Sequence, residues 1–439
     1  MTAATVSVPR GAGFGLGWSA AAQMVGTVLR LGNTLLLTRL LAPEAYAVIG
    51  TALVVLTTLE WLSDLGIIPA LVRHPEGTRP DWLLVGWWVA LSRGAGLSAV
   101  AAVCAVPLAH FYHLPDLAGV MFALALRPAL SALRSPAAPV LRRHLENRAL
   151  FVDEVGQVIV GAAVSIGVAA AYPASGAWAL AAGTLAGTLA GVVASYVLAP
   201  MRPRWFWDPA IARQLAGFGG AVFLNTLVMA AWLNLDRLVG ARLLPPEPIG
   251  LYVVAWSLAA AAEAVTTRGL EVYFALLARR SPEERAEWHD LTADRIARIA
   301  GPVLAVGVVI SPLVARVLYD SRYLGTGVLL ALLLARLLVR VAGQTDFQLL
   351  LARGRLRPAI LAYGAAAIAQ IAMIFPLTAA YGVVGLAFSV LASTVVVTAV
   401  QACLAPELGR RAMVRLGVAV VWAAIGLGGA FAVDRMITG

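Results

Sequence analysis

The chain has 439 residues and a net charge of +10, with 61% hydrophobic and only 13% charged residues. Its mean hydropathy of +0.85 excludes a soluble globular domain. The apolar runs have the length that a bilayer core of roughly 30 Å requires, and they lack the short alternating pattern of a membrane barrel. We therefore predict an all-α polytopic membrane protein.

The chain begins with a short tail that contains one arginine and no cleavage site after an apolar core, which is typical of a cytoplasmic N-terminus. Apolar segments follow in quick succession. We predict thirteen membrane spans, at residues 13–38, 45–72, 82–108, 114–134, 150–172, 175–199, 213–240, 248–278, 299–318, 323–352, 358–380, 382–405 and 416–433. The last of these spans is the weakest, and its presence decides whether the C-terminus lies outside.

Arginine supplies the positive charge, and its distribution predicts the orientation. If the N-terminus is cytoplasmic, the inward segments hold 21 arginines and the outward segments hold five. This asymmetry follows the positive-inside rule and predicts a cytoplasmic N-terminus. The arginines do not gather on one face, so nucleic acid is not a predicted partner.

An internal repeat relates the two halves of the chain. Residues 39–44 (RLLAPE) return as residues 242–247 (RLLPPE), and the same offset of 203 places Glu60 on Glu263. A second offset of 209 places Arg127 on Arg336. Six spans per copy give both copies the same orientation, related by an axis along the membrane normal.

The repeat predicts two six-helix lobes and one additional C-terminal span. The predicted boundaries are 1–200 for the N-terminal lobe, 201–212 for an interfacial linker rich in tryptophan and arginine, 213–405 for the C-terminal lobe and 406–439 for the additional span.

Local motifs predict three further features. Glycine pairs at 183, 187 and 191 are typical of close helix packing in span six. Three prolines, at 128, 136 and 139, predict a bend in or after span four. Ser281 begins a capping box before span nine. The amphipathic helix that it opens either lies along the inner membrane surface or simply extends span nine.

Ionisable residues inside the spans are the candidates for function, since an ionised side chain in a bilayer needs a partner or water. They form polar stripes on the second and fourth spans of each lobe, and these four helices are predicted to line a shared cavity. The candidate substrate-binding arginines are Arg30, Arg127, Arg268, Arg336 and Arg340. The candidate carboxylates for coupling to H⁺ or Na⁺ are Glu60, Asp64 and Glu263.

Two interpretations of these charges stay open. They either pair with one another and hold the helices in place, or they form a cationic cavity that attracts an anion. Guanidinium groups stay charged in a medium of low dielectric constant and bind phosphate through two parallel hydrogen bonds. A lipid-linked pyrophosphate sugar would suit such a cavity.

Motifs for catalysis and cofactors are lacking. The sequence contains no Walker motif, no nucleotide-binding loop and no cluster of a nucleophile with a base. His110 and His113 have a metal-like spacing, but no third ligand accompanies them. We therefore predict no catalytic residues, no metal and no cofactor.

Residues 35–50, followed by residues 63–73, resemble the start of the bacterial polysaccharide transporters, the O-antigen flippase family of the multidrug/oligosaccharidyl-lipid/polysaccharide (MOP) superfamily. Residues 234–252 resemble the same family's second repeat. The sequence departs from the family pattern at Ala47, where a glycine is usual, and at Pro248 and Ile249.

The resemblance implies a V-shaped pair of six-helix bundles that alternates between inward-open and outward-open states. It implies flipping of an undecaprenyl-diphosphate-linked oligosaccharide to the periplasmic leaflet of the inner membrane, for lipopolysaccharide or exopolysaccharide synthesis. The implied partners are the lipid-linked oligosaccharide, membrane lipids and other polysaccharide-assembly proteins.

Two other function classes are weighed against this one. A cation-coupled antiporter for small molecules, of the multidrug (MATE-like) type, would share the architecture, but a cationic drug would need an acidic cavity. A membrane glycan polymerase or ligase would be an enzyme with a large outward loop, and the predicted outward loops are all short. We predict a transporter and not an enzyme.

Overall fold

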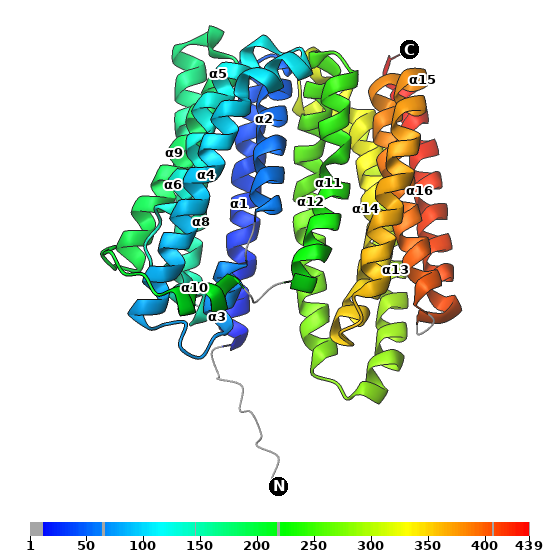
Figure 1. Ribbon diagram of the computed structural model, residues 1–439. Helices are drawn as coiled ribbons and strands as arrows, with labels where there is room; N and C mark the ends of the chain where they lie inside the picture. The colour runs from blue at the N-terminus through cyan, green and yellow to red at the C-terminus, as the bar shows by residue number, and fades with distance from the viewer. Residues whose placement is uncertain (1–11, 64–65, 145, 217–219, 406–407, 439) are drawn as a thin grey trace.

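The computed structural model describes residues 12–63, 66–144, 146–216, 220–405 and 408–438. These residues form α-helices and two short 3-10 turns, without a strand among them. Figure 1 shows two bundles of near-parallel helices side by side, with α1 beginning at one end of the molecule and α16 ending at the other. This is the predicted fold class, with six spans in each lobe and a thirteenth span after them.

The first lobe contains the helices that precede the linker. They are α1 (Ala12–Leu40), α2 (Pro43–Leu62), α3 (Ile67–Arg73), α4 (Pro80–Tyr112), α5 (Pro115–Leu124), α6 (Leu126–Ala132), α7 (Ala138–Arg143), α8 (Asn147–Ala171) and α9 (Ala177–Leu198), with the 3-10 turn η1 (Pro173–Ser175).

The helix α10 (Pro209–Ala216) follows the linker and contacts α3 and α4 of the first lobe. The second lobe and the helix that follows it contain α11 (Gly220–Leu243), α12 (Pro246–Ala278), α13 (Pro282–Leu318), α14 (Thr326–Ala352), α15 (Arg357–Leu404) and α16 (Gly409–Thr438), with the 3-10 turn η2 (Ser321–Tyr323). By length and hydropathy alone, nine of the described helices could each cross a membrane.

Some predicted spans are broken and others are joined. Span two is two helices, α2 and α3, separated at Gly66, whose φ of 64° favours glycine. Span four is also broken, after Leu124, because Pro128 has no N–H to donate to the Leu124 carbonyl. Spans eleven and twelve are joined as α15, which turns back sharply at Gly382 with φ 59° and ψ −137°.

The helix that opens at Ser281 is the straight beginning of α13. The Ser281 hydroxyl accepts a hydrogen bond from the N–H of Glu284, which confirms the N-cap half of the predicted capping box, and α13 then continues without a break to Leu318. The placement along the membrane surface is therefore wrong, and the extension of span nine is right. Trp288 and Ile296 explain why, since both pack against a buried cluster of the second lobe and fix the helix there.

The linker between the lobes packs on the first lobe. The Trp88 indole donates to the carbonyl of Arg204, and its ring lies 4.7 Å from that of Trp205. Trp205 is 75% exposed, as a tryptophan at the headgroup level would be. Large apolar side chains on the spans, such as Val103 and Val317, are also exposed, which is expected of a surface that faces lipid.

The lobes touch each other at one end, which we call the closed end and define by residues 38–46, 249–253 and 319–323. An ideal Cβ on Gly250 would lie 1.8 Å from the Pro43 carbonyl oxygen, so only glycine permits this approach. The Tyr323 hydroxyl donates to the Leu41 carbonyl at 2.8 Å, and α2 packs along α12. The core that surrounds this contact contains residues of both lobes.

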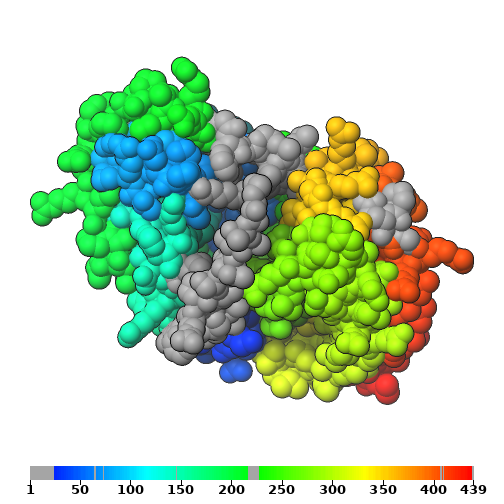
Figure 2. Space-filling view, turned by 90° about the horizontal axis from the view of Figure 1, so that it is seen from below, coloured from blue at the N-terminus to red at the C-terminus, as the bar shows by residue number. Residues whose placement is uncertain are grey.

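Away from the closed end the lobes diverge, as the ribbons in Figure 1 show. In α2, every buried residue lies between Pro43 and Leu56, and the last turns of the helix are partly or fully exposed. In α12, no residue between Ala259 and Tyr273 is buried. Figure 2 views the molecule from this divergent end and shows the two lobes on opposite sides. Glu60 and Glu263 lie where the divergence begins.

Candidate functional site

The second lobe contains a basic cluster, which we define as Arg237 of α11, Trp256 and Glu263 of α12, and Arg336 and Arg340 of α14. Helical spacing brings the members of each helix together, because Arg336 and Arg340 are four residues apart and Trp256 and Glu263 are seven apart. The packing of α12 on α14 then places the carboxylate against the two guanidinium groups.

One carboxylate is shared by two arginines in this cluster. A Glu263 oxygen lies 3.4 Å from Arg336 Nη1, and the other Glu263 oxygen accepts a hydrogen bond from Arg340. Arg336 is only 1% exposed, whereas the Glu263 side chain is 22% exposed. The carboxylate therefore lies between a buried arginine and the space where the lobes diverge.

Aromatic contacts complete the cluster. The guanidinium carbon of Arg336 lies 4.5 Å from the centroid of the Trp256 ring, and that of Arg237 lies 5.2 Å from it. Arg237 also donates to the Asn234 side chain at 2.6 Å. Cation–π contacts of this kind hold guanidinium groups in place without neutralising them.

The cluster has more positive charge than its carboxylates balance. Besides Glu263, Asp236 of α11 adds a second carboxylate, which accepts a hydrogen bond from the Tyr252 hydroxyl. Three guanidinium groups thus face two carboxylates. Among the described residues, three buried N–H groups of the cluster lack a partner: Nε of Arg237, Nε of Arg336 and Nε1 of Trp256. Buried unpaired donors are costly, and an anion would satisfy them.

The first lobe has an equivalent ion pair. Arg127 Nη1 of α6 lies 3.5 Å from a Glu60 oxygen of α2, and both side chains are about one quarter exposed. The two offsets of the repeat place this pair on Glu263 and Arg336. Arg93 of α4 lies close by and donates to the Ser63 hydroxyl at 3.1 Å and to the Glu60 carbonyl.

The other predicted site residues lie elsewhere. Arg30 is 4.0 Å from Glu154 of α8, and both side chains are exposed. Arg268 pairs at 2.6 Å with Glu271 on its own helix, again on an exposed face. Asp64 lies outside the described residues. The structure thus groups Arg336 and Arg340 with Glu263, and Arg127 with Glu60, whereas the ion pairs of Arg30 with Glu154 and of Arg268 with Glu271 are separate and exposed.

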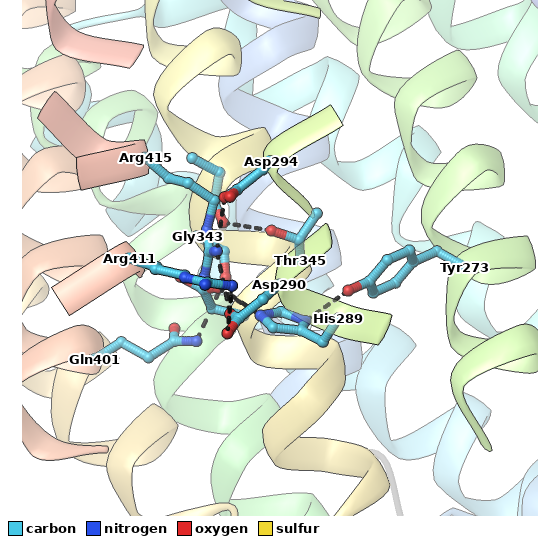
Figure 3. Close-up of polar contacts among 11 residues, drawn as sticks. Tyr273, His289, Asp290, Asp294, Gly343, Thr345, Gln401, Arg411 and Arg415 are labelled. Carbon is cyan, nitrogen blue, oxygen red and sulfur yellow. Dashed lines mark hydrogen bonds and ion pairs between the residues drawn. The ribbon is translucent and has the colours of Figure 1, made fainter. Parts of the chain in front are cut away.

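Two parts of the polar interior were missed by reasoning from sequence. Arg237 and Trp256 were not predicted as site residues. Arg237 nevertheless has polar neighbours in the sequence, Asn234 and Asp236, as expected of a charged residue that faces inward. The second is a buried network of Tyr273, His289, Asp346 and Arg415, which joins α12, α13, α14 and α16 (Figure 3). The sequence feature that indicates this network is His289, which lies on the apolar face of an amphipathic helix.

Comparison with solved structures shows the fold. The structure resembles the lipid II flippase MurJ in an inward closed conformation, with a TM-score of 0.66 and 12% identity over 96% of this chain and 97% of that one. It also resembles an inward-facing multidrug resistance MATE family transporter of the MOP superfamily, with a TM-score of 0.65 and 13% identity over 95% of this chain and 99% of that one.

Comparison of sequences shows the family. No curated protein matches the chain. Residues 36–327, which make up most of the chain, match the family described as "Polysaccharide biosynthesis protein". The chain is therefore a multi-pass membrane protein that belongs to this polysaccharide biosynthesis family and has the fold of the MOP transporters.

Proposed function

We propose that this protein flips a lipid-linked oligosaccharide, carried on undecaprenyl diphosphate, from the cytoplasmic to the periplasmic leaflet. The bacterial inner membrane is the proposed location, with a cytoplasmic N-terminus. The predicted lobes, 1–200 and 213–405, would move against each other by alternating access. The family supports a role in polysaccharide synthesis, and the fold supports a transporter.

The basic cluster carries the proposal for the substrate. A diphosphate offers oxygen acceptors to several N–H groups at once, and arginine binds phosphate through two parallel bonds. The unpaired Nε groups of Arg237 and Arg336 belong to guanidinium groups that both contact the Trp256 ring, where the lobe has excess positive charge. Arg127 of lobe one is about one quarter exposed, whereas Arg336 is buried and belongs to a group of three arginines with two carboxylates, so lobe two is the proposed anchor of the diphosphate.

Glu263 gives the cluster a second role. In the structure its carboxylate occupies the positions around Arg336 and Arg340 that a phosphate would take. Binding of the diphosphate would displace it, and a proton or Na⁺ would then compensate the freed carboxylate. Glu263, together with Glu60 and Asp64, is therefore the proposed route for coupling to a cation gradient.

The experiment measures flipping in proteoliposomes, as protection of a labelled lipid-linked oligosaccharide from an external glycosidase. Arg336→Gln should reduce substrate binding and flipping about tenfold or more, because a charge-assisted hydrogen bond contributes roughly 1.5–3 kcal/mol. Arg79→Gln is the control, since that arginine forms an exposed pair with Glu76 in the first lobe. Equal flipping by Arg336→Gln and the unchanged protein would refute the cationic site.

A cation-coupled small-molecule antiporter is the second candidate, favoured by the part-exposed carboxylates at Glu60 and Glu263. Excess guanidinium near Glu263 disfavours a cationic drug as substrate. The same liposomes separate the two functions, because an antiporter would exchange a dye for H⁺ or Na⁺ and leave the glycan lipid unflipped.

A further inference from the structure

The segment between the lobes forms a basic and aromatic surface on the first lobe. We call it the linker surface and define it as residues 201–216, which include α10. Figure 1 shows α10 beside the first lobe, at the end where the lobes diverge. Figure 2 shows this segment, in green, at the outer edge of the first lobe. The linker surface therefore lies at the periphery of the protein.

One set of linker side chains holds the segment on the first lobe. Met201, Phe206 and Ile211 pack against a buried cluster that contains residues of α3 and α4. Leu215 belongs to this cluster and is 1% exposed. The Trp88 indole of α4 donates to a linker carbonyl at 3.1 Å. The segment is thus fixed in place and has a defined outer face.

The outer face carries unbalanced positive charge. Arg202, Arg204 and Arg213 are exposed, and none of their guanidinium groups has a hydrogen-bond or ion-pair partner among the residues that the structure describes. Asp208 is the one acidic residue of the segment, and its carboxylate accepts the N–H of Ala210 at 2.8 Å at the start of α10. Three arginines and one aspartate leave an excess of positive charge that an anion from outside would complement.

Exposed tryptophans lie among these arginines. Trp205 is 75% exposed and Trp207 is 47% exposed. An indole ring in such a position suits the headgroup region of a bilayer, because one end of the ring is apolar and the other has an N–H to donate. The combination of free guanidinium groups and exposed indoles distinguishes this surface from a charged face that only meets water.

The helix that leads into the linker has an apolar stripe directed toward lipid. Leu189, Val193 and Val197 of α9 are spaced four residues apart and are 52%, 58% and 75% exposed. Residues at this spacing lie on one face of a helix. An acyl chain that follows the stripe to the end of α9 brings its headgroup to the level at which the linker begins. The stripe and the linker together therefore match the two parts of a phospholipid.

We propose that the linker surface binds the headgroup of an anionic phospholipid while an acyl chain lies along α9. Guanidinium groups bind phosphate through two parallel hydrogen bonds, and basic residues near an anionic leaflet add to the attraction. A zwitterionic lipid carries its own cation beside the phosphate and gains less from the free arginines. This surface is separate from the basic cluster, so the inference goes beyond the proposed transport function.

The test is native mass spectrometry of the full-length protein in detergent, titrated with phosphatidylglycerol or phosphatidylcholine. Phosphatidylglycerol should bind about tenfold or more tightly, because each arginine near an anionic lipid contributes to binding. The triple variant Arg202→Gln, Arg204→Gln and Arg213→Gln should lose this preference. Glycerol 3-phosphate, which has the phosphate without acyl chains, should not displace the lipid at the same concentration.

The matched control is the triple variant Arg279→Gln, Arg295→Gln and Arg298→Gln, which removes the same number of exposed charges from the second lobe and should keep the preference. Equal losses in the two triple variants would show attraction by total charge and overturn the proposal. Displacement by glycerol 3-phosphate would replace the lipid by a free phosphate ester as the ligand and overturn it as well.

A crosslink locates the lipid on the unchanged protein. Phosphatidylglycerol with a photoreactive headgroup should label residues 201–216, and phosphatidylcholine with the same group should label them far less. Labelling that avoids these residues would overturn the proposal even if a variant failed to fold. The experiments contain no glycan lipid, so their failure leaves the proposed flipping function standing.

Discussion

At the scale of single residues, Glu263 separates two neighbouring arginines, the buried Arg336 and the partly buried Arg340. Arg336 and Arg340 lie one helical turn apart on α14 and would repel without the carboxylate between them. Their shared partner keeps the substrate-free cluster stable, and any anion that binds there has to replace it. The residue is therefore a stabilising group and a competitor of the substrate at once.

Glu263→Gln should expose this double role. The amide removes the negative charge, so the variant should be destabilised by about 1–3 kcal/mol, less than for a fully buried pair because Glu263 is partly exposed. Inorganic pyrophosphate should then raise the melting temperature of the variant more than that of the unchanged protein. Thermal unfolding in detergent, with and without pyrophosphate, measures both effects.

The matched control is Glu271→Gln, which removes a carboxylate from an exposed pair on the same helix. Exposed pairs contribute little, so this variant should melt near the unchanged protein. An identical response of Glu263→Gln and Glu271→Gln to pyrophosphate would contradict an anion site at the cluster.

At the scale of elements, α8 and α9 pack closely because glycines of α9 meet α8 without side chains. An ideal Cβ on Gly187 would lie 2.8 Å from the Gln157 carbonyl oxygen, and one on Gly161 of α8 would lie 2.9 Å from the Gly183 carbonyl oxygen. These contacts confirm the packing role predicted for the glycine pairs of span six. Backbone, rather than a flexible side chain, forms the opposing surface.

Gly187→Ala should therefore push α8 away from α9 and lower the free energy of unfolding by about 1–3 kcal/mol, the usual effect of overpacking. Gly156→Ala, on α8, is the control. An ideal Cβ there meets nothing within 4 Å, and alanine favours a helix, so its stability should be equal or higher. Thermal unfolding measures the stability of both variants, and equal changes in the two would contradict the packing role of Gly187.

Much of this element-level structure could be predicted from the sequence, since apolar length fixes the spans and glycine and proline mark their breaks. The repeat likewise predicted that Glu60 and Glu263 occupy equivalent places. The contacts of Arg237 with Trp256 and of His289 with Asp346 could not be predicted. They depend on how neighbouring helices are rotated against each other, which spacing within one helix does not determine.

At the scale of the whole molecule, the closed end determines which side of the protein is open. Arg322 Nη2, on η2 of the second lobe, donates to the carbonyls of Thr38 and Arg39 of the first lobe, each at 3.2 Å. Asp320 orients Arg322, and the hydrogen bonds from Arg322 lower the pKa of Asp320 from its ordinary value. The Asp320 carboxylate thus stays charged at neutral pH. It is protonated, and its ion pair with Arg322 is lost, only when the pH falls through that lowered pKa.

Arg322→Gln should loosen the closed end and increase the population in which the lobes separate there. Spin labels at two exposed positions of that end, Tyr172→Cys in lobe one and Met436→Cys on α16, report the distance between them by pulsed electron resonance. The two native cysteines, Cys104 and Cys403, are replaced first. A longer-distance component should grow in the variant.

Arg316→Gln is the control for this measurement. Arg316 lies at the end of α13, but it donates to the Ile437 carbonyl of α16 and does not contact the first lobe. Its distance distribution should match that of the unchanged protein. Unaltered distances in Arg322→Gln would show that the close approach at Gly250 and the hydrogen bond of Tyr323 hold the lobes together without Arg322.

The thirteen predicted spans are an odd number, which has a practical consequence. The first helix starts and the last helix finishes at opposite ends of the molecule (Figure 1), so a fusion partner attached ahead of Ala12 and one attached beyond Thr438 would reside in different compartments. Compartment-sensitive reporters at the two termini would thus give opposite readouts on one polypeptide, and deleting residues 409–438 would bring both onto the same side.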